Sequence, residues 1–485
     1  MPVIQLNVLL KSAGITHSSS GNFVEISNIA IDSRKVSKGS LFVAIKGSEQ
    51  DGHKYIRKAI DAGASAIVCQ EKADVPDDIL MVLVEDSADA AGRLASAFYG
   101  HPSEALKLVG VTGTNGKTTT VTLLYQLMKQ LGHRTGLIST IENIVNGRVV
   151  VATHTTPDPV ELNALLAEMV AVGCEYAFME VSSHAAHQKR ISGLRFEGAV
   201  FTNITHDHLD YHKTFDDYIA AKKSFFDGLA SGSFALVNGD DRRSDIMLQN
   251  TKASKHFYSL RRSSEFKGKI FENTLEGLEM EIDGLHAHLL LIGEFNAYNA
   301  LCAYGICRLL GFEREVILTG LSALPGARGR FETVRDMNRG VLYIVDYAHT
   351  PDALEKVLKT IEVMKQKGGI ITVVGCGGHR DKEKRPKMGA IAASLSREAI
   401  FTDDNPRDEN PADITAAMMD GVDDADRNKV LIINDRAQAI KTAAKLASRG
   451  DIVLVAGKGH ETYQEGMNGK IDFDDRRVIE DIIGR

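Results

Sequence analysis

The chain has 485 residues, of which 25% are charged and 44% hydrophobic, and its formal net charge is −7. One hydrophobic core cannot organise a chain of this length, so we expect about three domains. The acidic balance argues against a nucleic-acid or membrane-surface partner. No apolar stretch approaches the ~20 residues of a membrane span, and no signal peptide opens the chain. The five cysteines form no C-x-x-C pair, so we expect buried free thiols and a cytoplasmic protein.

Short apolar runs recur along the chain with amphipathic helical segments between them. This pattern predicts buried parallel strands in an α/β fold. The runs that we expect to form strands are Leu108–Val111, Tyr176–Met179, Ala199–Thr202, Phe234–Val237, Leu342–Val345, Ile370–Val374, Ala399–Phe401, Leu431–Ile433 and Ile452–Val455. Residues 257–292 instead alternate polar and apolar with period two, which predicts an antiparallel hairpin appended to the central sheet.

Two segments have the composition of joints between domains. His101-Pro-Ser precedes the first of these strands, and residues 324–331 (L-P-G-A-R-G-R-F) combine proline and glycine as a hinge does. We therefore expect a small α/β N-terminal domain over residues 1–104, a central parallel-sheet phosphate-loop domain over 105–330, and a Rossmann-like α/β C-terminal domain over 331–485.

Residues 110–119, G-V-T-G-T-N-G-K-T-T, lie between a predicted strand and a segment with helical spacing. A strand, a glycine-rich turn and a helix form a phosphate cradle, in which backbone N–H groups and the helix N-terminus face the anion. Lys117 can then reach the terminal phosphates, and the Thr118 hydroxyl can hold Mg²⁺. The generic phosphate-loop pattern requires glycine at position 111, where this chain has Val111.

Two further segments place polar side chains in the central domain. Glu180, in M-E-V-S-S-H, ends a predicted strand, where ligand-binding residues of open α/β sheets collect, and its carboxylate suits Mg²⁺. A strand-end Glu in solvent is the alternative. Residues 206–212 contain three His and two Asp, which is typical of a metal site but also of an ordinary polar loop.

In this order, the motifs resemble those of the Mur ligase and folylpolyglutamate synthetase superfamily over essentially the whole chain. The motifs are the phosphate loop, E-V-S-S-H (180–184), T-N-I-x-x-D-H-L-D-Y-H (202–212), A-A-K (220–222), G-E-F-N-A-Y-N-A (293–300), R-G-R (328–330), V-D-Y-A-H-T-P-D (345–352) and G-K-G-H-E (457–461). Residues 31–52 resemble the UDP-binding domain of the muramyl-peptide ligases, which argues against the folylpolyglutamate branch.

The resemblance implies a monomeric, ATP-dependent, amide-forming ligase that works through an acyl phosphate and uses two Mg²⁺ ions. Implied ATP-binding residues are Gly113, Thr114, Asn115, Gly116, Lys117, Thr118, Thr119, Asn296, Arg330 and Asp346. Implied residues for the UDP-MurNAc-dipeptide are Ile31, Ser33, Ser48, Glu49, Gln50, Thr155, Thr156, Ser182, Gln188 and Arg190. Thr118 and Glu180 would hold one Mg²⁺. The second Mg²⁺ would be held by His208 and by Lys222, modified to a carbamate. The alternative for Lys222, in A-A-K-K, is a solvated helix face.

Four segments resemble the subfamily that adds the third amino acid to UDP-MurNAc-L-Ala-D-Glu: residues 154–157, 182–190, 377–382 and 404–407. In that subfamily D-N-P-R at 404–407 goes with meso-diaminopimelate, whereas lysine-adding enzymes commonly replace the Arg. Arg380 and Arg407 suit the distal carboxylate of diaminopimelate, because Arg forms bidentate hydrogen bonds to carboxylates. Asp404 and Glu461 can neutralise its ammonium. The implied amino-acid site comprises Arg380, Asp404, Asn405, Pro406, Arg407, Gly457 and Glu461.

Three alternatives stay open. They are a lysine-adding Mur ligase, a folylpolyglutamate synthetase, and a phosphate-loop switch that uses ATP only for conformational change. Taken alone, D-N-P-R also fits a plain Asn-Pro turn after a strand.

Overall fold

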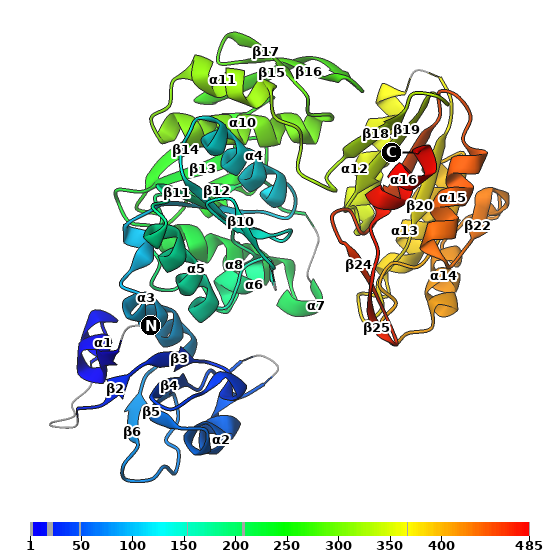
Figure 1. Ribbon diagram of the computed structural model, residues 1–485. Coiled ribbons are helices and arrows are strands. Elements are labelled where there is room, and N and C mark those ends of the chain that lie inside the picture. Colours follow the sequence, from blue (N-terminus) through cyan, green and yellow to red (C-terminus); the bar gives the residue numbers. More distant parts are fainter. Residues whose placement is uncertain are drawn as a thin grey trace. The chain divides into compact units, whose positions relative to one another are not determined.

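The computed structural model describes residues 3–16, 23–47, 50–152, 154–205, 209–365 and 367–484 (Figure 1). The chain forms two compact units, the first made of residues 1–204, 214–265 and 305–312 and the second of 205–213, 266–304 and 313–485. Both units are α/β, as predicted. Among the described helices, none combines the length and the apolar character needed to cross a membrane. All five cysteines are free and buried, as expected.

The N-terminal part of the first unit is a four-stranded parallel sheet with helices on both faces. Its strands, in spatial order, are β3 (Asn28–Ala30), β4 (Ser40–Val43), β5 (Ala64–Cys69) and β6 (Leu80–Leu83). Helices α1 (Leu6–Ser12) and α3 (Ser87–Phe98) share one buried cluster with this sheet, and α2 (Ile56–Asp61) shares another. Short elements complete this part: β1 (Ile4–Gln5), β2 (Glu25–Ile26), η1 (Ser33–Lys35), η2 (Gly52–Tyr55) and η3 (Pro102–Glu104).

The central part of the first unit contains eight strands of the large sheet, in the order β10-β9-β8-β11-β7-β12-β13-β14. Pairing is parallel except at β9 and β10. The strands are β7 (Lys107–Thr112), β8 (Thr135–Ile138), β9 (Asn143–Val145), β10 (Arg148–Val150), β11 (Tyr176–Glu180), β12 (Gly198–Phe201), β13 (Phe234–Asn238) and β14 (Ser254–Ser259). The helices are α4 (Lys117–Gln130), α5 (Pro159–Ala171), α6 (Ser183–His187), α8 (Phe215–Asp227) and α9 (Ser244–Met247). The four strands predicted here are confirmed within a residue or two.

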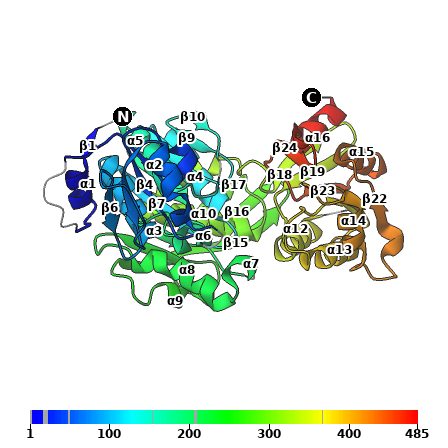
Figure 2. The same ribbon diagram turned by 90° about the horizontal axis from the view of Figure 1, so that it is seen from below.

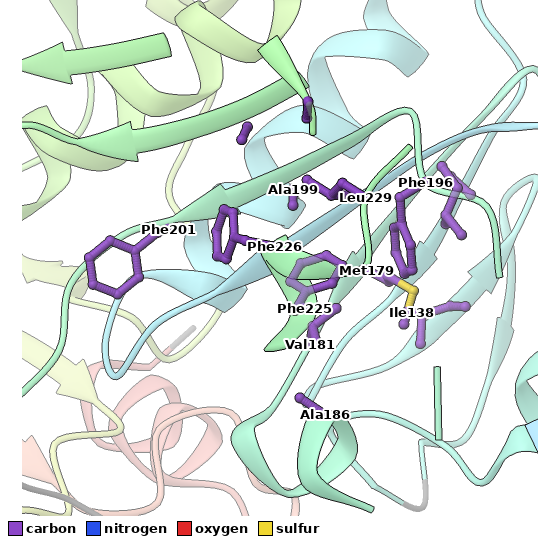
Figure 3. Close-up of a cluster of buried hydrophobic side chains, with 14 of the residues drawn as sticks. Ile138, Met179, Val181, Ala186, Phe196, Ala199, Phe201, Phe225, Phe226 and Leu229 are labelled. Carbon is purple, nitrogen blue, oxygen red and sulfur yellow. The ribbon is translucent and has the colours of Figure 1, made fainter. Parts of the chain in front are cut away.

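Gly110, in the middle of β7, lets α8 approach the sheet closely. A Cβ atom at this position would lie 2.6 Å from Phe225 Cζ and 2.9 Å from Phe196 Cε1, so a larger residue would displace both rings. These rings pack edge to face with their centroids 4.8 Å apart (Figure 3). Phe225 and Lys222 are three residues apart on α8 and therefore share a helix face. The close packing at Gly110 thus brings Lys222 toward the loop that follows β7.

The second unit contains an antiparallel meander rather than the predicted single hairpin. Its strands are β15 (Phe266–Thr274), β16 (Gly277–Ile282) and β17 (Leu285–Leu289). Asp283 and Gly284 both have positive φ, as a type I′ two-residue hairpin turn requires. The prediction was wrong at its N-terminal end, because residues 254–259 form β14, which pairs in parallel with β13. Helices α7 (Leu209–His212), α10 (Glu294–Leu309) and α11 (Arg314–Ser322) lie outside this meander.

The C-terminal sheet has the order β18-β19-β23-β20-β21-β22 and is parallel except at β18, which fits the Rossmann-like prediction. Its strands are β18 (Glu332–Asp336), β19 (Val341–Asp346), β20 (Ile370–Val374), β21 (Glu398–Phe401), β22 (Val430–Ile432) and β23 (Ile452–Ala456). Figure 2 shows α12 (Pro351–Met364), α13 (Lys384–Leu395) and α14 (Pro411–Met419) on one face, with α15 (Arg436–Leu446) and α16 (Asp475–Ile483) on the other. A short hairpin, β24 (Tyr463–Gly466) and β25 (Gly469–Asp472), and η4 (Arg427–Lys429) complete the unit.

Candidate active site

The phosphate loop connects β7 to α4, and two residues that follow β12 hold it in place. Thr114 N and Asn115 N donate to the backbone and side-chain oxygens of Asn203, at 2.8 and 3.0 Å. Thr202 Oγ1 donates to Asn115 O at 2.6 Å. Gly113 has a φ of +151°, and a Cβ atom there would lie 1.9 Å from Thr202 Oγ1, so this position requires glycine. The loop is therefore preformed.

The first turn of α4 follows directly, as the motif predicted. Gly116 is the N-cap residue with a φ of +89°, and the helix begins at Lys117. The N–H groups of the first helical turn have no partners within the helix and are the groups that bind anions. Thr118 and Thr119 lie in this turn and are buried.

Two lysine side chains converge on one backbone oxygen of the loop. Lys117 Nζ donates to Gly113 O and to Thr114 O, each at 2.9 Å. Lys222 Nζ, from α8, donates to the same Gly113 O at 2.9 Å and lies 4.6 Å from the centroid of the Tyr218 ring. Only 1% of Lys222 is exposed, so the interpretation of its segment as a solvated helix face is wrong for this residue.

Glu180, the last residue of β11, is completely buried next to the phosphate-loop strand, so the alternative of a Glu in solvent is wrong. The strand register pairs Glu180 with Val111. The Glu180 carboxylate accepts hydrogen bonds from Thr140 N at 2.8 Å and Thr140 Oγ1 at 3.2 Å. Thr140 Oγ1 also contacts Thr155 Oγ1 at 3.1 Å. Sequence analysis missed Thr140, because it follows β8, a strand that the apolar pattern did not reveal.

The residues predicted to bind the peptide and sugar form a hydrogen-bond network with Glu180. Thr156 Oγ1 donates to Glu180 O at 2.8 Å and accepts from Ser182 N at 3.1 Å. Arg190 Nη1 donates to Thr156 O at 2.8 Å, and Arg190 Nη2 donates to Gln188 Oε1 at 2.7 Å. The structure therefore brings these predicted residues together, although their contacts with a substrate stay a prediction.

Ile31 and Ser33 follow β3 in the N-terminal sheet. Between them, the Asp32 carboxylate accepts from Arg34 N at 2.9 Å and from Arg34 Nη2 at 2.7 Å, and these bonds lower the pKa of Asp32 to about 2. This local pairing orders the turn that carries Ser33. Gln50 is exposed. Ser48, Glu49 and His208 lie outside the described residues, so their predicted roles stay predictions.

The residues predicted for the adenine and ribose lie in the second unit. Asn296 Nδ2 donates to Ile292 O at 2.9 Å. Arg330 lies over the ring of Tyr347, with its Cζ 4.4 Å from the ring centroid. The buried Asp346 carboxylate accepts from Phe331 N at 2.7 Å, and burial raises the pKa of Asp346. Asp346 therefore fixes the backbone directly after Arg330. Contact with a nucleotide stays a prediction for these residues.

The predicted amino-acid site is built from loops at the carboxyl ends of β20, β21 and β23. Arg380 Cγ and Arg407 Nη1 would each lie 3.4 Å from a Cβ atom placed on Gly377, so both arginine side chains border this glycine. Arg407 has a φ of +57°, and its Nη1 donates to Gly378 O at 2.5 Å. Non-glycine residues with positive φ are uncommon and cluster at functional sites. A Cβ on Gly457 would lie 2.7 Å from Asp404 Oδ2, which explains glycine at that position.

Lys458 is a component of this site that sequence analysis missed. Its side chain is completely buried, and Lys458 Nζ donates to Asn405 Oδ1 at 3.0 Å and to Glu461 Oε2 at 2.8 Å. Asn405 Nδ2 donates to the same Glu461 oxygen at 2.8 Å. Glu465 N donates to Asn405 Oδ1 at 2.9 Å. The Asn405 side chain thus connects its own loop to Lys458, Glu461 and Glu465. Glu461 already has a cationic partner in Lys458. The motif G-K-G-H-E contained Lys458, but nothing in its spacing revealed this pairing.

The donor groups near the phosphate loop fit a hard cation. Among the residues that the structure describes, no group of three or more His, Cys, Asp or Glu gathers as a metal site. However, Glu180 has only neutral hydrogen-bond partners among those residues, and a buried carboxylate without a positive partner is unfavourable. Carboxylate and hydroxyl oxygens, such as those of Glu180 and Thr118, are the ligands that Mg²⁺ prefers.

Three family models match the chain in order. They are the Mur ligase family catalytic domain (residues 25–99), the Mur ligase middle domain (111–307) and the Mur ligase glutamate ligase domain (329–459). The chain belongs to the Mur ligase family. The resemblance stated from the motifs is therefore confirmed, and the chain has the three-domain architecture of the family.

Relatives within the family cover the whole chain. A UDP-N-acetylmuramoyl-L-alanyl-D-glutamate–2,6-diaminopimelate ligase from Cytophaga hutchinsonii is 54% identical over 482 residues, which is 99% of each chain. The ligase of the same name from Parabacteroides distasonis is 54% identical over 95% of each chain. A solved structure of a ligase of that name matches with a TM-score of 0.70 at 30% identity, covering 100% of this chain and 99% of the other. A folylpolyglutamate synthase from Mycobacterium tuberculosis, with a TM-score of 0.62 at 16% identity, shares the fold over 81% of this chain and 94% of its own.

Proposed function

We propose that this protein is an ATP-dependent ligase that adds meso-diaminopimelate to UDP-MurNAc-L-Ala-D-Glu in peptidoglycan precursor synthesis. One observation carries the proposal: the side chains of Arg380 and Arg407 both lie next to Gly377, the first through its Cγ and the second through its Nη1. Two side chains that end in guanidinium groups therefore start from the same part of the predicted amino-acid site. Two such groups suit the distal carboxylate of diaminopimelate, which L-lysine lacks. The names of relatives that are 54% identical over nearly the whole chain support the same substrate.

The first chemical step joins the D-Glu carboxylate to the γ-phosphorus of ATP and releases ADP, giving an acyl phosphate. Negative charges meet in this step, so the protein must supply positive groups and hydrogen-bond donors. Lys117 and the N–H groups at the start of α4 hold the β- and γ-phosphates. The network of Thr155, Thr156, Ser182, Gln188 and Arg190 orients the peptide whose carboxylate reacts.

Thr118 and Glu180 would hold one Mg²⁺, and His208 with carbamylated Lys222 a second. A bound Mg²⁺ neutralises phosphate charge and so lowers the cost of bringing the carboxylate to the γ-phosphate. In the second step the amine of diaminopimelate attacks the acyl carbon, the amide bond forms and phosphate leaves. The distal end of the diaminopimelate molecule is held by Arg380, Arg407 and the loops at 404–407 and 457–461.

A phosphate-release assay with UDP-MurNAc-L-Ala-D-Glu and a panel of amino acids tests the proposal. Turnover with meso-diaminopimelate should exceed that with L-lysine by roughly a thousandfold, because loss of a charge-assisted pair in a closed site costs several kcal/mol. Arg407→Ala should raise the KM for diaminopimelate steeply and leave the KM for ATP nearly unchanged. Equal rates with lysine would contradict the assignment, and a preference for lysine would identify a lysine-adding ligase. Turnover only with a folate acceptor and glutamate would identify a folylpolyglutamate synthetase.

A further inference from the structure

Buried cations lie beneath the loops of the predicted amino-acid site. The Arg436 guanidinium pairs with the Asp475 carboxylate at 2.7 and 2.8 Å, and its Nη2 donates to Ala456 O at 3.0 Å. The Arg385 guanidinium donates to Glu409 Oε2 at 3.0 Å. Each arginine therefore has a carboxylate outside the residues predicted to bind substrate, and each ties down the base of a loop.

Lys458 differs from these two arginines because its partners are themselves predicted to bind the amino acid. Its Nζ contacts only Asn405 Oδ1 and Glu461 Oε2 by hydrogen bonds among the described residues, at 3.0 and 2.8 Å, and lies 5.4 Å from the centroid of the Tyr463 ring. The side chain has no exposed surface, so solvent does not screen its charge. Lys458 therefore sets how much negative charge Glu461 presents.

The charges of the site balance only if Lys458 is counted. The charged residues predicted to bind the amino acid are Arg380, Asp404, Arg407 and Glu461. Two charged side chains pair with them: Lys458 with Glu461, and Glu465, whose carboxylate lies 3.4 Å from Arg407 Nε. Together these residues carry three positive and three negative charges. His460 adds no charge, because burial lowers its pKa to about 3. Without Lys458 the same set would carry one net negative charge. The distal head of diaminopimelate, a carboxylate plus an ammonium, is neutral, whereas the distal end of L-lysine is a cation.

We propose that Lys458 is a specificity-determining residue: its buried ammonium keeps the amino-acid site electrically neutral and thereby favours an amine with a zwitterionic distal end over one that ends in an ammonium alone. The inference rests on the proposed function and names a determinant of its substrate choice that acts without touching the substrate.

The test compares Lys458→Met with Lys470→Met. Lys470 lies on β25, is exposed, and has its Nζ 4.1 Å from the centroid of the same Tyr463 ring, so it is a matched control for loss of a lysine at this hairpin. For Lys458→Met we expect the ratio of kcat/KM for meso-diaminopimelate to that for L-lysine to fall by at least about tenfold, through the amine KM, while the ATP KM stays within about twofold. Lys470→Met should keep the wild-type ratio.

A merely structural role for Lys458 would lower both kcat/KM values together, and an unchanged ratio in Lys458→Met would overturn the inference. Lys458→Arg should keep the ratio near that of the wild type, because it keeps the charge; a collapse of the ratio in this variant would also count against it. If the substituted chains do not fold, the test uses the kinetics of the wild-type protein with two amines that each lack half of the distal head. L-2-Aminopimelate has only a distal carboxylate, and L-lysine has only a distal ammonium. In a neutral site both should have a lower kcat/KM than diaminopimelate, and their two values should lie within about tenfold of each other. A clear preference for lysine over L-2-aminopimelate would contradict a neutral site. Wild-type protein that does not use diaminopimelate at all would refute the proposed function instead.

Discussion

At the scale of single residues, the most unusual feature is the pair of lysines at Gly113 O. Both Lys117 Nζ and Lys222 Nζ lie 2.9 Å from this oxygen, in a part of the protein where Lys222 is buried. Two like charges at one acceptor repel each other, and low exposure strengthens the repulsion. Carbamylation of Lys222, the addition of CO₂ to its neutral amine, would remove the repulsion by converting a cation into an anion able to bind Mg²⁺.

Lys222→Ala should therefore be nearly inactive, and added acetate or formate should partly restore its activity by replacing the missing carboxylate. Lys223→Ala is the matched control, because Lys223 pairs with Asp227 on the same helix and contributes no group to the phosphate loop. It should keep most of the wild-type activity. A mass measurement on protein kept in bicarbonate that shows Lys222 unmodified, together with no rescue by acetate, would contradict carbamylation.

Lys117→Ala should abolish ligase activity. The substitution removes the positive charge that offsets the phosphoryl group during transfer, while the loop keeps its bonds to Thr202 and Asn203. Initial rates of phosphate release measure the effect. Lys129→Ala, at the exposed far end of the same helix, should be close to wild type. Retention of more than a few per cent of activity by Lys117→Ala would mean that Lys117 does not stabilise the transferred phosphoryl group.

His460 makes the stability of the protein depend on pH. Burial lowers its pKa from 6.5 to about 3, so between these values the unfolded chain binds a proton that the folded protein does not. The stabilisation is fully present above pH 6.5 and falls as the pH decreases, by up to about 1.4 kcal/mol per pH unit. The melting temperature should thus drop more between about pH 7.5 and about pH 5.5 in the wild type than in His460→Asn. An equal decrease in melting temperature for the two proteins would show that the pKa of His460 is not lowered by burial.

Site residues could be predicted from the sequence when they belong to a recognised motif. Glu180, Thr156 and Arg190 belong to motifs, and the structure joins them in one network. Thr140 could not be predicted, because its partner Glu180 is distant in sequence. Lys458 pairs locally with Glu461, but its bond to Asn405, which ties it to the loop at 404–407, is also distant in sequence. A hydrogen bond across 40 or 53 residues leaves no periodic signal in the chain.

At the scale of elements, buried parallel strands were predictable and amphipathic or short ones were not. Ile370–Val374 forms β20 with the predicted bounds, because five consecutive apolar or β-branched residues are buried on both faces. Thr135–Ile138 is equally buried but reads T-G-L-I, and its glycine weakened the signal. A Cβ at Gly136 would lie 2.2 Å from Met169 Sδ, so that glycine is required by packing against α5, which only the tertiary structure reveals.

At the scale of the whole molecule, the predicted binding residues are divided between the two compact units. The phosphate loop, Glu180 and Lys222 belong to the first unit, whereas the loops at 404–407 and 457–461 belong to the second. The family models end and begin at residues 99, 111, 307 and 329, close to the predicted joints, whose positions stay a prediction. A reaction that needs residues of both units should proceed only when all of its substrates are bound, which also protects an acyl phosphate from water.

ADP formation should therefore be coupled to both other substrates. With ATP and Mg²⁺ alone, the rate should be no more than roughly one per cent of the full reaction, because water must be excluded before the phosphoryl group moves. Adding UDP-MurNAc-L-Ala-D-Glu without an amine should allow at most one equivalent of ADP per protein, as acyl phosphate accumulates. Continuous turnover should require diaminopimelate as well. A coupled ADP assay measures all three conditions, and the Lys117→Ala protein reports any contaminating ATPase. Sustained ADP release from ATP alone would instead identify a nucleotide-driven switch, since a switch needs neither acceptor nor amine to cleave its nucleotide.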